Sequence, residues 1–374
     1  MAKWVLTISQ LTGNGQEAYS DVIQEKIISG KLVKTLGDTA KLTFSIAARN
    51  LPVGSDYAPF CAYVTLDRYN GAFYRMFTGL VEKRTYSVID GIYTFECCGG
   101  LGAHKYFAPF RLFGPGSNID DVVRIIGERY RNTASSPYNT YNPTADIYKN
   151  IYDLRYLGDT RCTLGVWLNE RLAEISSSAA TSYDFLKEII NIECFEEYDA
   201  TWTEPFLFED PDGLIIAKMR STTPQAQAIR YDKNLISCEI TDEPTVTIAD
   251  VKNKSQRQVV VASNYPDPPF YYQDYILPDK SGSGTYTNTE LQTYGNIQLQ
   301  NPPRTISAVG FDRGILDDGT PFLTMDAPVN LVYLEGYTEK TIETYITSIT
   351  YNLTNPAQDR VQLGRKIIPL TQRS

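Results

Sequence analysis

The sequence predicts a mainly β protein with an α+β insert, in which two similar antiparallel β-barrel modules flank mixed α/β lobes. Composition is one reason, because 12% of the 374 residues are aromatic and 27 are tyrosine, and such residues favour strands over helices. A second reason is pattern, because both ends of the chain alternate apolar and polar residues as half-buried strands do. In the middle of the chain the apolar residues recur at helical spacing instead.

We assign residues 1–105 to the first β module. The run "KLTFSI" at 41–46 places its three apolar side chains on one face of a strand. An Asn-Gly pair at 70–71 and an Asp-Gly pair at 90–91 separate alternating runs further along. Such pairs tolerate positive φ, so they predict two β-hairpins within a small antiparallel barrel or sandwich.

Residues 106–180 are assigned to an α/β lobe with a long loop. The stretch "SNIDDVVRIIGERY" at 117–130 carries an apolar helical stripe and begins with a capping box. Apolar spacing also indicates a helix at 165–176. The polar, proline-containing residues 131–148 between these helices predict a loop.

Residues 181–245 are assigned to an acidic lobe made of a helix and a β-hairpin. In "TSYDFLKEII", Thr181 is expected to cap the helix and Asp184 to complete the capping box. The stretch "PFLFEDPDGLIIAKM" at 205–219 then predicts two strands joined by an Asp-Pro-Asp-Gly turn.

Residues 246–374 are assigned to the second β module. The first part predicts a strand pair at 246–263 and a long loop at 265–288. The last part, 337–366, predicts two long alternating strands joined at an Asn-Pro pair. These strands repeat the out-and-back pattern of residues 77–100 without sharing its identities. The repeat is the reason for predicting two similar modules.

The net charge of −9 lies mainly in the middle of the chain: residues 1–105 carry +2, residues 106–245 carry −9 and residues 246–374 carry −2. Proteins that read DNA or RNA need clustered Lys and Arg, so we expect no sequence-specific nucleic-acid binding.

No apolar run approaches the roughly 20 residues that cross a bilayer, and we expect no membrane-spanning segment. The N-terminus also lacks a signal peptide's apolar core, so the scattered cysteines predict reduced thiols.

One cluster raises the question of a metal or nucleophile site. Cys97, Cys98 and the single histidine, His104, lie within eight positions. Adjacent strand residues point to opposite faces, so the two thiols do not readily share one tetrahedral zinc, and no second ligand pair exists. No oxyanion motif accompanies a cysteine nucleophile, and the motifs of hydrolases and phosphate-binding loops are missing. We interpret the cluster as a strand end, with a metal site or catalysis as the alternative.

The stretch 193–212 holds eight carboxylates and no basic residue. Asp210 and Asp212 have the spacing of a calcium loop, although the downstream glutamate of an EF-hand is missing. Paired carboxylates also hydrolyse glycosides. A solvated hairpin accounts for the stretch and no cofactor or metal is expected, with calcium and glycan binding or hydrolysis as alternatives. The glycan alternative predicts that Glu196, Glu197, Glu204 or Glu209 lines a pocket with aromatic residues such as Trp202.

In the order of its parts the chain resembles the baseplate hub family of tailed phages, which includes the tail-tip proteins called tail-associated lysins. "DTAKLTFSIAARN" followed by "RMFTGLVEKRTYSVIDGIYTFECCG" resembles the first tube-forming module of that family. "TSYDFLKEIINIECFEEYDATW" with "DPDGLIIAKM" resembles its internal helix and hairpin. "ITSITYNLTNPAQDRVQLGRKIIPLT" resembles the closing strands of the second tube module. The resemblance is one of organisation over most of the chain and includes no diagnostic fingerprint.

The resemblance implies a structural hub at the tail tip, or baseplate, of a siphophage-type virion, made in the host cytoplasm. It implies a homotrimer, because two similar modules per chain then form a pseudo-six-fold ring against the hexameric tail tube. The implied partners are the distal tail protein hexamer, the tape-measure protein and the receptor-binding proteins, and the ring opens or closes the channel for DNA release. Many members end in a peptidoglycan-degrading domain. Since this chain stops at Ser374, we expect the short form, a structural hub without enzymatic activity.

Two expectations concern interfaces and the biological setting. The long alternating strands carry the side chains that we expect to pack between modules or between copies, namely Phe77, Val81, Tyr345 and Ile349. The hub of a contractile injection or secretion particle is an alternative with the same fold, which gene neighbours would separate from a phage hub.

Overall fold

The structure of the chain is a computed structural model. It describes residues 3–11, 17–22, 27–51, 57–59, 61–69, 72–103, 105, 154–156, 181, 183–184, 205–209, 211, 215–219, 221, 223–242, 248–252, 256–261, 272–276, 286–300, 304–310, 323–325, 327–355 and 358–364. Within these ranges strands dominate, so the chain is mainly β, as the composition predicts.

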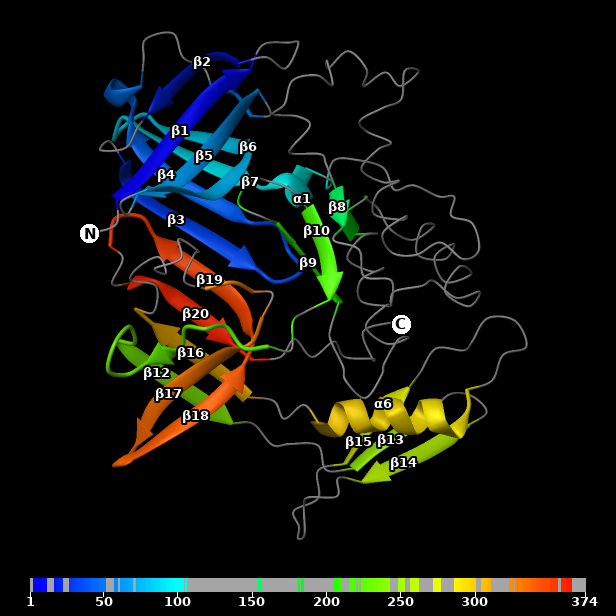
Figure 1. The fold of residues 1–374 in the computed structure, drawn as a ribbon. Coiled ribbons are helices and arrows are strands. Elements are labelled where there is room, and N and C mark those ends of the chain that lie inside the picture. Colours follow the sequence, from blue (N-terminus) through cyan, green and yellow to red (C-terminus); the bar gives the residue numbers. More distant parts are fainter. Residues whose placement is uncertain are drawn as a thin grey trace.

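Most of the strands belong to one antiparallel sheet of eleven strands (Figure 1). In order across the sheet they are β12 (Ser237–Asp242), β16 (Arg304–Val309), β20 (Arg360–Leu363), β19 (Ile346–Asn352), β3 (Ile27–Thr35), β4 (Lys41–Ala47), β7 (Ile92–Cys98), β6 (Phe73–Ser87), β5 (Ala62–Tyr69), β1 (Lys3–Leu11) and β2 (Glu17–Val22). The strands from the two ends of the chain therefore form one continuous sheet. No sheet among the described strands closes on itself, and the predicted barrels stay a prediction.

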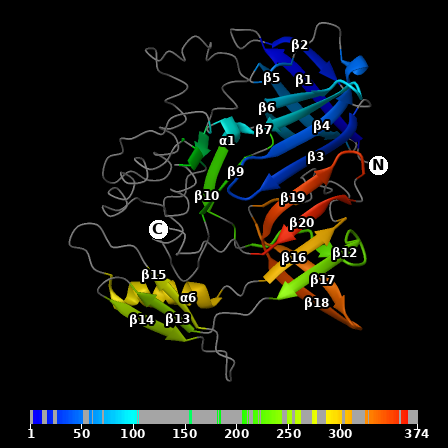
Figure 2. The ribbon, with the colours of Figure 1, turned by 180° about the vertical axis from the view of Figure 1, so that it is seen from behind.

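The two halves of this sheet meet where β19 pairs with β3. The register sets Tyr351 opposite Leu32, and just beyond the ladder the amide of Leu353 donates to the carbonyl of Gly30 at 2.9 Å. Figures 1 and 2 show the two strands side by side from opposite directions. Backbone hydrogen bonds therefore connect segments from opposite ends of the chain.

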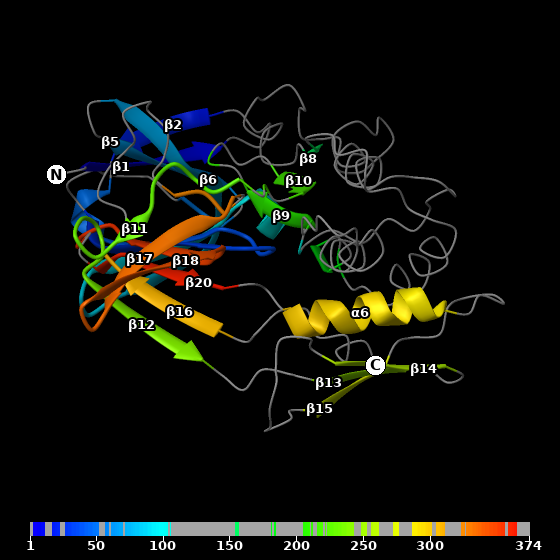
Figure 3. The same cartoon turned by 60° about the horizontal axis from the view of Figure 1, so that its bottom comes forward.

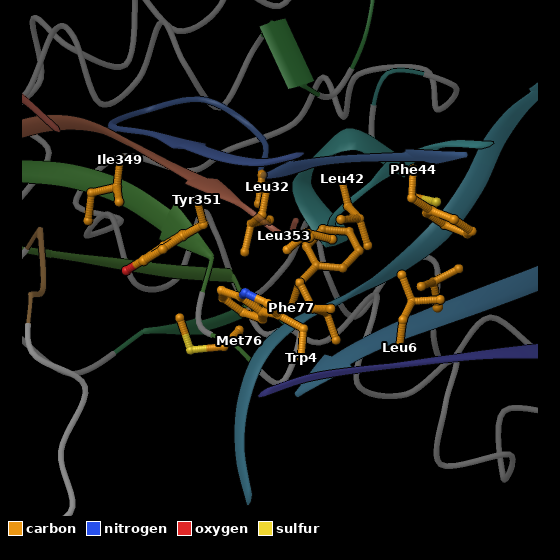
Figure 4. Packing of buried hydrophobic residues seen from close by; sticks show 14 of the residues in the cluster. Trp4, Leu6, Leu32, Leu42, Phe44, Met76, Phe77, Ile349, Tyr351 and Leu353 are labelled. Atoms are coloured by element: carbon orange, nitrogen blue, oxygen red, sulfur yellow. The ribbon is translucent and has the colours of Figure 1, made fainter. Parts of the chain in front are cut away.

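The core lies on one face of the sheet. β4 buries every second side chain, as the run at 41–46 predicts, and the ring of Phe44 stacks on that of Phe95 with centroids 5.0 Å apart. Side chains from both ends of the chain share this core (Figure 4). Tyr351 of β19 meets Trp4 of β1 edge-on at 5.9 Å, so the joint is sealed by apolar packing as well as by the backbone ladder.

Smaller elements surround the large sheet. Three further sheets have three strands each. They consist of β11 (Ile229–Arg230), β17 (Val329–Glu335) and β18 (Thr338–Thr344); of β14 (Arg257–Val261), β13 (Ile248–Lys252) and β15 (Tyr272–Ile276); and of β8 (Leu154–Tyr156), β10 (Ile215–Met219) and β9 (Pro205–Glu209). The described helices are η1 (Ala48–Asn50), α1 (Gly100–Ala103) and α6 (Asn288–Gln300), and α6 lies along the sheet of β13 to β15 (Figure 3). No helix in the described ranges is both long and apolar enough to span a membrane.

The same strand order occurs twice in the chain. β3, β4, β7, β6 and β5 pair in sequence in the N-terminal half, and β12, β16, β20, β19 and then β18 with β17 follow the same order in the C-terminal half. Tyr345 alone separates β18 from β19, so these two strands together correspond to the long β6. β6 has a bulge against β7, between Val81 and Lys83, and β19 has a bulge against β20, between Ile346 and Ser348. The repeat inferred from pattern is therefore present in strand order.

Several local predictions are confirmed. β6 and β7 form a hairpin that turns at Asp90-Gly91, where Gly91 has φ +63°. The strand pair at 246–263 is β13 with β14, and the hairpin at 205–219 is β9 with β10. The helices predicted at 117–130 and 165–176 lie outside the described residues.

Two local predictions are wrong. The stretch 265–288, predicted as a loop, contains β15, because strand pairing with β13 supplies order that local sequence does not. The strand that begins the last out-and-back pair is divided at Tyr345, since its first half pairs with β17 and its second half with β3 and β20. The domain limits at 105, 180 and 245 stay predictions, although β12, before residue 246, pairs with β16, after it.

The central joint predicts a large loss of stability on truncation. Leu32 is fully buried between Leu42 and Tyr351 on the neighbouring strands, so Leu32→Ala should lower the free energy of unfolding by about 2–5 kcal/mol. Urea unfolding followed by tryptophan fluorescence measures the change. Lys31→Ala, at the exposed neighbouring position, is the matched control and should change stability by less than about 0.5 kcal/mol. Equal effects of the two would contradict the assignment.

Candidate functional site

The β9–β10 hairpin of the predicted acidic lobe is attached to the large sheet through Glu209, at the end of β9. Its Oε1 accepts hydrogen bonds from the hydroxyl of Thr39 (2.9 Å) and the amide of Leu101 (2.6 Å), and its Oε2 accepts one from the amide of Ala40 (2.7 Å). The residue is only 8% exposed. One buried carboxylate therefore fixes the β9–β10 hairpin to the β3–β4 connection and to α1, and we call this contact the Glu209 junction.

A close backbone approach makes the Glu209 junction possible. A Cβ atom at Gly99 would lie 1.9 Å from Oε2 of Glu209, so only glycine leaves room for the carboxylate. The turn that follows β9 is also held, because the hydroxyl of Thr78 in β6 donates to the carbonyl of Pro211 at 3.0 Å.

A second contact ties the predicted helix at 181 to the same β3–β4 connection. The hydroxyl of Tyr183 donates to the carboxylate of Asp38. The amide of Asp184 donates to Oγ1 of Thr181 at 3.2 Å, and the Thr181 hydroxyl donates to the Asp184 carboxylate at 2.7 Å. The predicted N-cap at Thr181 is therefore confirmed, and Asp184 bonds back to the Thr181 hydroxyl.

Burial governs the protonation of Glu209. It raises the pKa of this carboxyl from 4.5 to about 7, against the hydrogen bonds from Ala40, Thr39 and Leu101, which lower it. The negative charge of Asp38 adds to the rise in pKa. Thr39 lets both protonation states fit, because its hydroxyl also lies 3.3 Å from the carbonyl of Ala40. When Glu209 is protonated, that hydroxyl can turn to the carbonyl and accept the carboxyl proton on its oxygen.

The two adjacent cysteines lie beside the Glu209 junction. Burial raises the pKa of Cys98 to about 12 and holds that of Cys97 well above its ordinary range, so neither is a ready nucleophile at neutral pH. β7 ends at Cys98 and α1 follows, which confirms the interpretation as a strand end. His104 lies outside the described residues, and those described include no group of His, Cys, Asp and Glu arranged to hold a metal ion.

The geometry of Glu209 suits attachment and not glycoside hydrolysis. A catalytic carboxyl has to reach the glycosidic bond, whereas this one is buried and bonded on both oxygens. The other glycan candidates, Glu196, Glu197, Trp202 and Glu204, lie outside the described residues and stay predictions, as do the calcium candidates Asp210 and Asp212.

A polar hollow of about 620 Å³ lies on the face of β12, β16, β20 and β19 that points away from the core. Glu239 is the single carboxylate among its described lining residues, and Arg360 the single cation. Glycoside hydrolysis uses a pair of carboxyl groups, so the hollow does not supply the glycan alternative with its machinery.

The four predicted interface residues lie on corresponding strands of the two halves. Phe77 and Val81 on β6 and Ile349 on β19 are buried in the shared core, and Tyr345 is half-buried between β18 and β19. Their contribution to contacts between copies stays a prediction.

Comparison with known proteins bears on the fold. No protein family matches the sequence, and no curated protein matches it. Among solved structures, the 43 kDa tail protein of prophage MuSo2 from Shewanella oneidensis matches with a TM-score of 0.59, 10% identity and 98% of both chains. A tail protein from Neisseria meningitidis MC58 matches with a TM-score of 0.60, 10% identity and 98% of both chains. This chain has the fold of phage tail proteins.

The same fold extends to a protein complex from Francisella. The PdpA–VgrG complex of Francisella matches with a TM-score of 0.51 and 10% identity, over 99% of this chain and 54% of the other. At such identities the likeness shows the fold alone, and the positions of the Glu209 junction are features of this sequence.

The raised pKa of Glu209 predicts how attachment depends on pH. Because its pKa is higher in the folded chain than in the unfolded one, its favourable contribution is complete below pH 4.5 and is lost as pH rises through about 7. The free energy of opening the β9–β10 hairpin should fall by up to about 3 kcal/mol between pH 4.5 and pH 8. Hydrogen exchange of residues 205–219, corrected for the intrinsic rate at each pH, measures it. Glu209→Gln should flatten this dependence, and Glu239→Gln, on exposed β12, should not.

The close approach at Gly99 gives a second prediction. Gly99→Ala should displace the Glu209 carboxylate and speed hydrogen exchange in β9 by at least about tenfold, the effect of losing roughly 1.4 kcal/mol of a buried hydrogen-bonded contact. Gly336→Ala, in the β17–β18 turn with no neighbour within 4 Å, is the control and should leave β9 unchanged. Normal protection of β9 in Gly99→Ala would contradict the junction.

Proposed function

We propose that this chain is a structural hub protein of a phage tail baseplate. Three copies form a ring that joins the hexameric tail tube, through the distal tail protein, to the tail tip, and the ring opens or closes the channel for DNA release. The two halves of the large sheet act as its two tube modules, each curling into a barrel. The chain works in the virion after synthesis in the host cytoplasm, without a cofactor or a catalytic step.

The observation that supports this proposal is the strand order repeated within one continuous sheet. A chain that carries the same arrangement twice presents two similar faces, and three such chains present six. Six similar faces match a partner ring of six-fold symmetry without requiring six identical copies. The fold shared with the prophage tail proteins over nearly all of both chains agrees with a place in a tail.

The middle lobes have a separate role in this proposal. Among the described residues, the β9–β10 hairpin and the start of the helix at 181 meet the ring through polar contacts, at the Glu209 junction and between Asp38 and Tyr183. β8, β9 and β10 form a sheet that is separate from the large one. A few hydrogen bonds of this kind can break while the backbone pairing of the large sheet stays intact. We assign the lobes to closing the tail tip before infection, near the tape-measure protein in the channel and the receptor-binding proteins outside it.

A hub of a contractile or secretion particle is the second candidate. The match to the PdpA–VgrG complex, over 99% of this chain and 54% of the other, is compatible with it, because the fold then also occurs outside the prophage tail proteins. The two candidates share a trimeric ring and differ in the particle around it, so the genes beside this one decide between them.

The mass of the native particle tests the hub proposal. Light scattering over a concentration series should give three chain masses, because the ring needs three copies. A stable monomer at every concentration would contradict it. Calcium should leave the mass unchanged, and a change of size on adding it would instead favour the calcium alternative for the acidic stretch.

A further inference from the structure

The joint between β19 and β3 occurs once within the chain, and the repeat shows where an equivalent joint belongs. β19 corresponds to the second half of β6. β19 pairs with β20 after a bulge, and β6 pairs with β7 after a bulge. β12 corresponds to β3, because β12 pairs with β16 as β3 pairs with β4, and β16 and β4 occupy equivalent places in the two halves. The equivalent joint therefore pairs β6 with β12, two strands that lie far apart in the sheet order of one chain.

Matching the two bulges fixes the correspondence residue by residue. Glu82 in β6 corresponds to Thr347 in β19, because each is the extra residue of its bulge. The strand pairings from β7 through β4 to β3, and from β20 through β16 to β12, then carry the correspondence to β3 and β12. The equivalent positions at the joint are Arg84 with Ile349, Thr85 with Thr350, Tyr86 with Tyr351, Leu32 with Ile240, Val33 with Thr241, and Lys34 with Asp242.

Both strands present an outer edge. β12 is the first strand of the sheet and pairs, among the described strands, with β16 alone. β5 pairs with β6 only as far as Leu80, so the second half of β6 has β7 on one side and no described strand on the other. Tyr86 there is 44% exposed, whereas its equivalent Tyr351, at the β3 joint, is 2% exposed. Edges of this kind are sites for pairing with another chain.

We propose that the outer edge of β6 in one copy of this chain pairs antiparallel with the outer edge of β12 in the next copy, repeating the β19–β3 joint between copies. The inference rests on the proposed ring and names the surface that holds it together. The contact joins two different edges head to tail, and such contacts form a closed ring when the rotation between copies returns to the start.

Complementary residues support this register. Transferred from the internal joint, it sets three pairs opposite each other across copies: Thr85 with Thr241, Tyr86 with Ile240, and Arg84 with Asp242. One pair is polar, one is apolar and one is oppositely charged, which are favourable combinations on neighbouring strands. The alignment uses backbone pairing and bulges only, so the charge match is an independent observation.

Cysteine cross-linking tests the register. In a chain whose Cys61, Cys162, Cys194 and Cys238 are replaced by serine, Thr85→Cys with Thr241→Cys should form disulfides between copies under mild oxidation. The products should run as two and three chain masses and no larger. Thr85→Cys with Ser237→Cys is the matched control, since four residues along a strand place the thiols about 13 Å out of register, beyond the Cα separation of up to about 7 Å that a disulfide spans. Equal cross-linking of both pairs would overturn the proposal.

A charge exchange tests the same joint with the native cysteines in place. Arg84→Asp or Asp242→Arg alone should weaken assembly by about tenfold per joint, because like charges then lie opposite each other. The double variant Arg84→Asp with Asp242→Arg should restore assembly, and Lys340→Asp, on exposed β18, should not alter it. Light scattering measures the association in each case.

The outcomes separate this inference from the hub proposal. A trimer that neither cross-links in register nor recovers in the double variant overturns the β6–β12 joint and leaves the hub standing. A monomer at every concentration overturns both. Register-specific cross-links that continue beyond three chains support the joint and overturn the closed trimer.

Discussion

The backbone ladder between β3 and β19 is the contact on which the rest of the structure depends. It makes one sheet out of strands from opposite ends of the chain, and the core then includes side chains of both ends, such as Trp4 and Tyr351. The long insert between these strands does not prevent this. Loop closure costs only about 0.6 kcal/mol more for each doubling of loop length, so the chain tolerates large lobes between β7 and β12 while its ends stay paired.

The molecule uses two kinds of attachment with different physical properties. The two halves of the sheet share backbone hydrogen bonds and a dry core, which open only on unfolding. Among the described residues, the β9–β10 hairpin meets the large sheet at the hydrogen bonds around Glu209, a carboxyl whose pKa burial raises to about 7. This difference allows the β9–β10 hairpin to open while the large sheet stays intact, as the proposed hub requires of its lobes.

The internal repeat also explains why the two halves differ in detail. Ile349 corresponds to Arg84, and Tyr351 to Tyr86, yet the residues of β19 are buried and those of β6 are not. β3 covers β19 within the chain, whereas the second half of β6 meets no described strand on its outer side. An apolar residue suits the covered position, and a charged one suits an edge that no described strand covers.

Local chemistry in the sequence determined the elements whose order is local. Alternation gave β4 its buried face, the Asp-Gly pair gave the β6–β7 turn, and Thr181 with Asp184 gave the helix cap. Tertiary structure decided the rest. The side of α6 that meets its sheet includes Leu291 and a glycine, Gly295, which lies close to Val260. Because a glycine takes one of the packed positions, the sequence shows no apolar stripe that would predict this helix. Glu209 stood among eight carboxylates, and only the fold distinguishes it, because desolvation and hydrogen-bond donors are supplied by residues remote in the chain.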